Sequence, residues 1–377
     1  MNLTEEQTLI RDMARKFAAE RLAPGALERD REARFPADEV KEMGELGLMG
    51  MLIPEDWGGA GVDHVSYGLA MEAIAGGDGA TSTIMGVQTL TEMIIVRYGS
   101  EEQKSRFLPG LASGENLGAF MLTEPQTGSD AAAIKCRAKR DGNRYILNGT
   151  KQFITTGKYA DLAVVFAVTD PDSEKKGISA FIVPTEGEGY RVSSIEKKMG
   201  QRGSDTAQIV FEDMELTPDL LIGEEGEGYK IALSNLEGGR IGIAAQATGM
   251  AEAAFEAART YAKERTAFGK PIAGHQAVAF RLADMATNIE AARHMYLNAA
   301  RLRDAGEACL KEASMAKLFA SEMAEKVCSD AIQIHGGYGY VEDFPVERIY
   351  RDVRVCQIYE GTSDVQRLVI SRTLLED

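Results

Sequence analysis

The chain has 377 residues, 44% of them apolar and 27% charged, so it is long enough for about two or three packed domains and too apolar for a disordered protein. Its 42 lysines and arginines are outnumbered by 58 aspartates and glutamates, and the net charge of −16 argues against nucleic acid as the main partner. We find no basic and apolar leader and no stretch with the roughly 20 apolar residues of a membrane span, so we expect a cytoplasmic protein with no membrane partner.

Residues 1–118 are predicted to form an N-terminal all-α domain. Thr4 and Gln7 have the spacing of a capping box, and the apolar residues that follow recur at helical intervals until Pro24 and Gly25. Further helices are predicted over residues 36–48, 65–75, 82–98 and 101–112.

Short apolar runs separated by glycine-containing turns replace the helical pattern after residue 118. They cover residues 120–122, 145–149, 163–168, 179–183 and 207–211. Runs of this length and spacing are typical of strands. They predict a middle antiparallel β-barrel or sandwich over residues 119–228.

Long amphipathic patterns return over residues 229–377 and predict a C-terminal four-helix bundle. The patterns cover residues 229–264, 275–304, 308–335 and 363–375. Helices, then strands, then helices, with no alternation of strand and helix, indicate an α+β fold and argue against a doubly wound one.

Several common signatures of catalysis are absent. The sequence has no G-x-G-x-x-G after a strand, no Walker loop, no H-E-x-x-H and no G-x-S-x-G. The four cysteines form no C-x-x-C pair and the four histidines are scattered, so we expect neither a disulfide framework nor a metal site. Composition and common signatures therefore leave the chemistry open.

Six short motifs nevertheless occur together and in register. They are residues 122–130 (LTEPQTGSD), 153–155 (FIT), 199–204 (MGQRGS), 265–269 (RTAFG), 333–337 (QIHGG) and 359–363 (YEGTS). The set closely resembles the acyl-CoA dehydrogenase family, and the resemblance covers essentially the whole chain. It implies a homotetrameric flavoenzyme of fatty-acid or amino-acid catabolism that holds FAD between the middle domain and the bundle. The implied reaction converts a short or short-branched acyl-CoA to the trans-2-enoyl-CoA and passes electrons to electron-transferring flavoprotein.

Glu360 is the predicted catalytic base. A thioester α-proton is weakly acidic, and a carboxylate on a tight turn with a raised pKa suits its removal. Some relatives place the base earlier in the chain, at the position of Gly239, which has no side chain to serve as one. The resemblance also implies that the Glu360 N–H binds the thioester carbonyl. The alternative to a catalytic Glu360 is an ordinary solvated glutamate in a loop.

The resemblance assigns substrate contacts to four residues. They are Ser129, Glu237, Arg240 and Gly361. For Glu237 and Arg240, the alternative is an exposed charge pair at i and i+3 on a helix.

The resemblance assigns a larger set of residues to FAD. They are Leu122, Thr123, Ser129, Phe153, Ile154, Thr155, Arg265, Phe268, Gln276, Gln333, Ile334, His335, Gly336, Gly337, Thr362 and Asp364. Arg265, Phe268 and Gln276 are expected to reach the cofactor of a neighbouring subunit. The alternatives are an ordinary turn at residues 122–129 and a place in the barrel core for Phe153.

The sequence departs from the family pattern at three places. Phe153 stands where many relatives have tryptophan, Ala267 where some have a hydroxyl, and residues 87–92 (VQTLTE) where many have an Asn-Ser motif beside the acyl pocket. We expect Glu92 to lie on an exposed helix face. Two other functions remain open: an acyl-CoA oxidase or other flavin enzyme that uses oxygen, and a non-catalytic acyl-CoA-binding relative.

Overall fold

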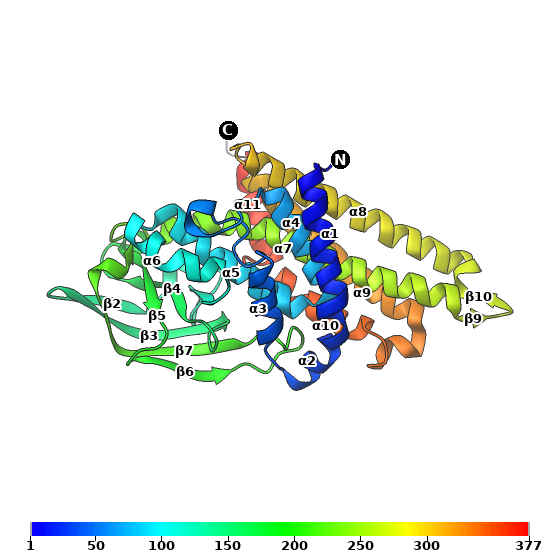
Figure 1. The fold of residues 1–377 in the computed structure, drawn as a ribbon, viewed down its shortest axis with the longest axis horizontal. Helices are drawn as coiled ribbons and strands as arrows, with labels where there is room; N and C mark the ends of the chain where they lie inside the picture. Colours follow the sequence, from blue (N-terminus) through cyan, green and yellow to red (C-terminus); the bar gives the residue numbers. More distant parts are fainter. Residues whose placement is uncertain (1, 376–377) are drawn as a thin grey trace.

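The computed structural model describes residues 2–375, and its N-terminal part is helical as predicted (Figure 1). Its α-helices are α1 (Glu5–Phe17), α2 (Ala26–Glu32), α3 (Ala37–Glu45), α4 (His64–Gly77), α5 (Gly79–Tyr98) and α6 (Glu101–Ala112). The capping box is confirmed, because the side chains of Thr4 and Gln7 each accept a hydrogen bond from the other's backbone N–H. Most residues of α4 and α5 are buried, so these two helices lie inside the molecule.

The middle part of the chain forms one large sheet. Its strands are β1 (Gly118–Met121), β2 (Arg137–Asp141), β3 (Arg144–Thr155), β4 (Leu162–Val168), β5 (Ile178–Pro184), β6 (Tyr190–Ile195), β7 (Thr206–Leu216) and β8 (Leu221–Ile222). Seven of them follow the order β6-β7-β3-β2-β4-β5-β8, and β1 pairs with β4 off this path. Most pairings are antiparallel as expected, but β1 and β2 each pair with β4 in parallel.

The C-terminal part is the predicted helical bundle, with a short hairpin at one end. It contains α7 (Gly228–Glu264), β9 (Thr266–Ala267), β10 (Lys270–Pro271), α8 (Gln276–Asp304), α9 (Leu310–His335), α10 (Val346–Val353) and α11 (Ser363–Leu375). The long helix α7 packs against α8 and α9, and also against α4 and α5. The β9–β10 hairpin lies at the end of the molecule opposite the sheet (Figure 1).

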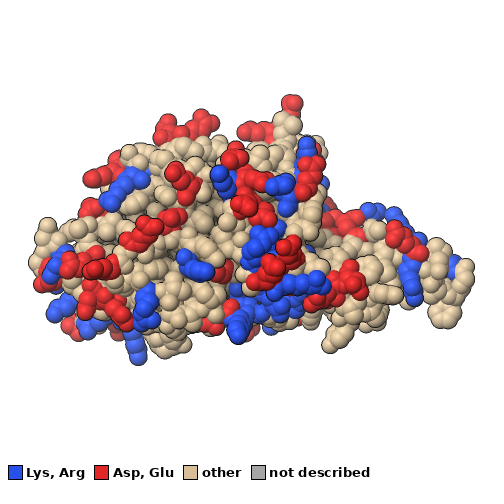
Figure 2. Space-filling model, turned by 60° about the horizontal axis from the view of Figure 1, so that its bottom comes forward, with Lys and Arg blue, Asp and Glu red and all other residues tan. Residues whose placement is uncertain are grey.

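Two hydrophobic clusters hold the fold together. One combines α1, α3 and α4 with the bundle helices, and the other joins the sheet to α6 and to the ends of α5 and α7. Helix α5 contributes to both clusters, so it lies where the two meet. No helix within residues 2–375 has the length and apolar character needed to span a bilayer. On the face shown in Figure 2, acidic and basic side chains are interspersed.

Candidate active site

Glu360 lies on a tight turn between a 3-10 segment (Arg354–Gln357) and α11. Its φ is +51° and that of Gly361 is +90°, so two consecutive residues take left-handed conformations. Such a conformation is uncommon for glutamate and persists only where the surroundings enforce it. Gln366 donates from its side chain to the Gly361 carbonyl (2.9 Å), and Lys317 donates to the same oxygen (2.6 Å).

The Glu360 carboxyl group is largely enclosed. Its Oε2 is shielded from solvent and has no hydrogen-bond partner among residues 2–375. Burial raises the pKa of Glu360 to about 7, although the cations of Lys317 and Arg240 act in the opposite direction. A carboxyl group with this pKa is suited to accepting a proton near neutral pH.

Gly239 on α7 lies directly against this carboxyl group. A Cβ at position 239 would overlap Glu360 Oε2 and would lie 3.1 Å from Leu90 Cδ2 of α5. The site therefore needs glycine here to leave room for Glu360. Positions 239 and 360, the two alternative positions of the base in the family, are therefore neighbours in space.

Arg240 and Glu237 have different environments, although they are three residues apart on α7. Arg240 is buried, and its Nε and Nη1 have no hydrogen-bond partner among the described residues. Glu237 instead pairs with Arg303 (3.4 Å) and accepts a hydrogen bond from Cys309 Sγ (2.9 Å). The alternative of an exposed Glu237–Arg240 pair is therefore wrong, because Arg240 is buried and Glu237 is engaged elsewhere.

A chain of buried hydrogen bonds connects the Glu360 turn to the rest of the molecule. Tyr359 donates to the side-chain oxygen of Gln246, whose amide donates to Thr83 Oγ1 (2.7 Å). Thr83 donates to the Gln201 side chain (2.6 Å), and Gln201 donates from its amide to the Asp352 carbonyl (3.1 Å). The chain links α7, α5, the loop after β6 and α10, and so contributes to fixing the turn.

The end of β1 carries the first group of predicted cofactor residues. Leu122 is buried, and its carbonyl accepts a hydrogen bond from Lys151 Nζ (3.1 Å), which also pairs with Glu124 (2.8 Å). The Thr123 carbonyl accepts from the backbone of β3 (2.9 Å), and Ser129 is exposed further along the loop. The segment is thus more firmly held than an ordinary turn, because a buried ion pair lies beneath it.

Phe153 lies on β3 next to this segment and is solvent-exposed over 62% of its surface. The β3–β7 register shifts between Lys151 and Ile154, and Phe153 has a φ of +59°. This irregularity turns the Phe153 ring out of the sheet while Ile154 stays buried and Thr155 is half-buried. Placing Phe153 in the barrel core is therefore wrong.

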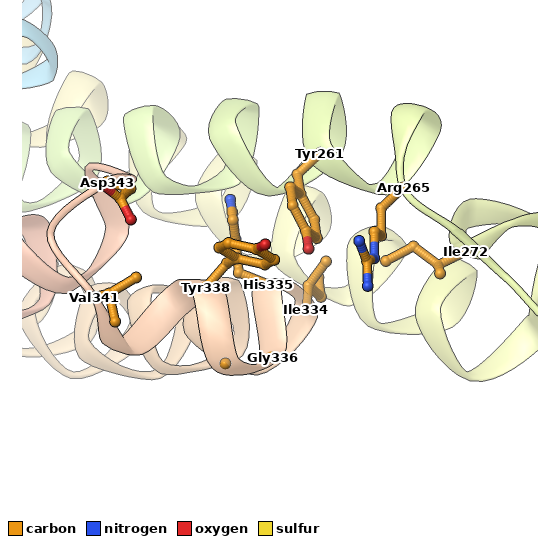
Figure 3. A pocket seen from close by; sticks show the side chains of 10 residues that line it. Tyr261, Arg265, Ile272, Ile334, His335, Gly336, Tyr338, Val341 and Asp343 are labelled. Carbon is orange, nitrogen blue, oxygen red and sulfur yellow. The ribbon is translucent and has the colours of Figure 1, made fainter.

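A cavity of about 630 Å³ lies at the junction of α7 and the end of α9. In Figure 3, Tyr261 and Arg265 at the end of α7 face His335 and Tyr338. Burial lowers the pKa of His335, whose Nε2 is shielded and has no partner within the described part of the chain. Ile334, Gly336 and Gly337 also line this cavity.

The remaining predicted cofactor residues lie at element ends. Thr362 caps α11 by accepting from the Val365 N–H (3.3 Å), Asp364 is exposed in its first turn, and Gln333 is exposed near the end of α9. Phe268 is 96% exposed on the β9–β10 turn, and Gln276 is exposed at the start of α8. The structure thus brings Glu360 together with Arg240, and Arg265 with His335, whereas Phe268 and Gln276 are exposed to solvent.

The expectation of an exposed Glu92 is wrong. Glu92 is fully buried on α5, and neither carboxyl oxygen has a partner among residues 2–375. Burial holds the pKa of Glu92 well above the ordinary value for a glutamate. The polar residues around it suggested a solvated face, but α5 lies between α4, α7 and β1. Leu90, from the same stretch, is the residue that reaches Gly239.

Sequence reasoning missed Lys317, Gln246 and Thr83. Lys317 was detectable in principle, because it falls on the apolar stripe that includes Ala313 and Ala320 of α9. The hydrogen bonds from Gln246 to Thr83 and from Thr83 to Gln201 each span more than 100 residues of sequence, and no local pattern marks these residues.

The described residues fit a flavin nucleotide. An exposed aromatic ring in a strained conformation at Phe153 suits stacking on a planar ring system. Arg265 beside the open Gly336–Gly337 backbone suits a diphosphate, since a Cβ at either glycine would meet no atom of the described residues within 4 Å. The Thr156 hydroxyl and the His335 Nε2, which have no hydrogen-bond partner among residues 2–375, leave polar groups for a ligand to satisfy.

Comparisons with known proteins find similar sequences and structures. Models of the acyl-CoA dehydrogenase N-terminal, middle and C-terminal domains match residues 4–115, 119–214 and 226–375. An acyl-CoA dehydrogenase of Bacillus subtilis is 50% identical over 100% of this chain and 99% of its own length. A short-chain specific acyl-CoA dehydrogenase of Clostridium acetobutylicum is 47% identical over 98% of each chain.

Two solved structures have nearly the same fold as this chain. Butyryl-CoA dehydrogenase from Megasphaera elsdenii superposes with a TM-score of 0.98 at 41% identity, covering 100% of both chains. A chain from an Acidaminococcus fermentans structure, described as electron transferring flavoprotein in a study of flavin-based electron bifurcation, superposes with a TM-score of 0.99 at 48% identity. It too covers 100% of both chains.

Proposed function

Because this chain belongs to the acyl-CoA dehydrogenase family and is an FAD-dependent oxidoreductase, we propose that it oxidises a short or short-branched acyl-CoA to the trans-2-enoyl-CoA. The observation that carries the proposal is the Glu360 carboxyl group, enclosed on a strained turn with a pKa of about 7. The short-chain assignment rests on the similarity to the Clostridium acetobutylicum and Megasphaera elsdenii enzymes.

We assign the base role to Glu360. Its carboxylate removes the α-proton of the thioester, and its backbone N–H donates to the thioester carbonyl, where negative charge develops. FAD, when bound, supplies the acceptor for the hydride that leaves Cβ. The buried Arg240 guanidinium, whose Nε and Nη1 have no partner among the residues that the structure describes, is assigned to substrate contact together with Gly361 and Ser129. Glu237 contributes indirectly at most, because Arg303 and Cys309 already bind its carboxylate.

The remaining motif residues are assigned to FAD in two groups. The segment from Leu122 to Ser129 and residues 153–155 would hold the flavin ring, because they place backbone groups and the exposed Phe153 ring side by side. Arg265 and residues 333–337 would hold the diphosphate and adenosine in the cavity of Figure 3, and Thr362 and Asp364 would complete the cofactor contacts.

The test is anaerobic mixing of the purified holoenzyme with butyryl-CoA. The flavin absorbance should bleach within the stopped-flow time range, and mass spectrometry should find the enoyl-CoA product. A holoenzyme that dithionite bleaches but that no short acyl-CoA reduces would refute the proposal.

We further propose that electron-transferring flavoprotein is the electron acceptor. Support comes from the family resemblance and from the Acidaminococcus fermentans structure. Reoxidation of the substrate-reduced enzyme should be much faster with electron-transferring flavoprotein than with dissolved oxygen. The opposite order of rates would favour the oxidase alternative.

A homotetramer is the proposed assembly. The Phe268 ring is almost completely exposed at the tip of the hairpin, and an aromatic side chain in that position is suited to burial against a second subunit. Gln276 and Arg265 lie near the same end of the bundle. Light scattering should give about four chains per particle, and a monomer that is fully active and saturated with FAD would contradict the assignment.

A further inference from the structure

Lys317 lies on α9 directly beneath the Glu360 turn. The whole residue is inaccessible to solvent, and it falls on a stripe of buried alanines that includes Ala313, Ala316 and Ala320. Burying an ammonium group is costly unless it is paired and hydrogen-bonded. Its Nζ donates to the carbonyl oxygen of Gly361 at 2.6 Å, so the turn supplies the acceptor.

The turn is held at this carbonyl from two sides. Gln366 of α11 donates from its side-chain amide to the backbone carbonyl oxygen of Gly361 (2.9 Å) and to the backbone carbonyl oxygen of Glu360 (3.3 Å). The left-handed conformations of Glu360 and Gly361 therefore have two external anchors. Only the anchor from Lys317 carries a charge.

The charged and titratable groups around Lys317 and Glu360 come from three other elements. Arg240 projects from α7, Cys356 lies on the 3-10 segment before the turn, and Tyr67 on α4 lies within electrostatic range of Glu360. Burial raises the pKa of both Tyr67 and Cys356, so these two groups are neutral near pH 7. The charges that act on Glu360 are therefore those of Lys317 and Arg240.

Lys317 itself remains charged at neutral pH. Burial lowers its pKa to about 8, and Glu360 opposes that change. For the carboxyl group of Glu360, Lys317 is the larger of the two cationic influences that oppose burial. Lys317 is thus placed to act on both the conformation and the ionisation of the base.

We propose that Lys317 is a positioning residue of this reaction. It anchors the turn that bears Glu360 by donating to the Gly361 carbonyl, and it favours the ionised, proton-accepting form of the Glu360 carboxyl group. The inference rests on the proposed function for its consequence in catalysis. The effect of Lys317 on the ionisation of Glu360 does not involve substrate, so it can be measured without turnover.

Two substitutions separate the two roles. Lys317→Gln keeps a donor for the Gly361 carbonyl and removes the charge, whereas Lys317→Met removes both. A nearby opposite charge lowers a carboxyl pKa by about 1 unit or more. In both variants the acid limb of flavin reduction by butyryl-CoA should therefore move up by about 1 pH unit, a loss of about tenfold at pH 6. Above pH 9, Lys317→Gln should recover the wild-type rate, and Lys317→Met should not.

Lys326→Met is the matched control. Lys326 lies on the same helix, but its side chain is exposed and pairs with Asp330. Its pH profile should coincide with that of the wild type. Circular dichroism and thermal unfolding report whether each variant folds, and Lys317→Gln remains informative if Lys317→Met does not fold.

Infrared titration of the holoenzyme without substrate gives the second readout. The carboxyl band of Glu360 is identified as the one that disappears in Glu360→Gln, and its midpoint should rise in both Lys317 variants. An unchanged midpoint and an unchanged acid limb in Lys317→Gln overturn the proposal. A raised midpoint in an enzyme that acyl-CoA does not reduce supports the electrostatic role of Lys317 and refutes the proposed function instead.

Discussion

Replacing Glu360 with glutamine is expected to abolish turnover and, at the same time, to stabilise the folded protein above neutral pH. Glutamine keeps the size of the side chain and the backbone N–H but accepts no proton. Loss of a general base lowers a rate by about 10²–10⁴-fold. The rate of flavin reduction by butyryl-CoA should fall by at least this factor, while dithionite still reduces the flavin.

The gain in stability follows from the pKa of the carboxyl group. Folding raises the pKa of Glu360 from 4.5 to about 7, so the folded state binds its proton more tightly than the unfolded state does. As pH rises from about 4.5 to 7, the folded wild type therefore loses stability, by up to about 3 kcal/mol at pH 8. The glutamine variant avoids this loss. For a chain of 377 residues the difference corresponds to a Tm higher by about 4 °C.

Thermal unfolding of both holoenzymes at pH 8 and pH 5 provides the measurement. The Tm difference should be largest at pH 8 and should shrink to less than about a third at pH 5, where Glu360 is protonated in the folded wild type. Glu188→Gln, at an exposed position, is the control and should leave Tm and rate unchanged. A variant that is less stable than the wild type at pH 8 would show that burial does not destabilise the ionised Glu360 carboxylate. A variant that turns over at close to the wild-type rate would show that Glu360 is not the base.

Three further predictions concern the pH dependence of the rate, the glycine beside Glu360, and the buried ion pair beneath residues 122–129. The rate of flavin reduction should rise about tenfold between pH 6 and pH 8, because Glu360 has a pKa of about 7 and acts in its ionised form; a rate independent of pH over this range would contradict that role. Gly239→Ala should eliminate most turnover in a folded protein, because the added Cβ overlaps the Glu360 carboxyl group, whereas Gly238→Ala, whose Cβ would lie 3.4 Å from its nearest neighbour, should remain active in the same assay. Lys151→Met should lower the free energy of unfolding by about 3–5 kcal/mol, because it leaves Glu124 charged and buried; adding Glu124→Gln should recover part of this loss in urea titrations, and two additive losses would argue against the pairing.

Local patterns predicted most of the helices because helix formation depends on neighbours along the chain. The capping box at Thr4 and Gln7 and the long helices of the bundle are examples. The short helix α10 was not predicted, since it has only eight residues and follows a glycine cluster. The outward position of Phe153 was also not predictable, because it depends on the irregular pairing of β3 with β7.

Features of the site that depend on tertiary contacts were harder to predict. The partner of Glu237 is Arg303, which is 66 positions later and on another helix, so the i, i+3 spacing to Arg240 was misleading. Glu92 was misjudged because a polar helix segment does not reveal what packs around it. The motif at Tyr359 and Glu360 marked the candidate base, whereas its support by Lys317 required the fold.

The buried hydrogen-bond chain from Tyr359 through Gln246, Thr83 and Gln201 to Asp352 has a consequence for how members of such a family diverge. Its links come from the first, middle and last thirds of the sequence, and each side chain is at least half-buried. A chimera that takes residues 119–228 from a relative with a different side chain at position 201 would strand polar atoms of Thr83 and Asp352 in the interior. Substitutions at these positions are therefore expected to be inherited as a set, and exchange of the middle segment should succeed only between relatives whose sets match.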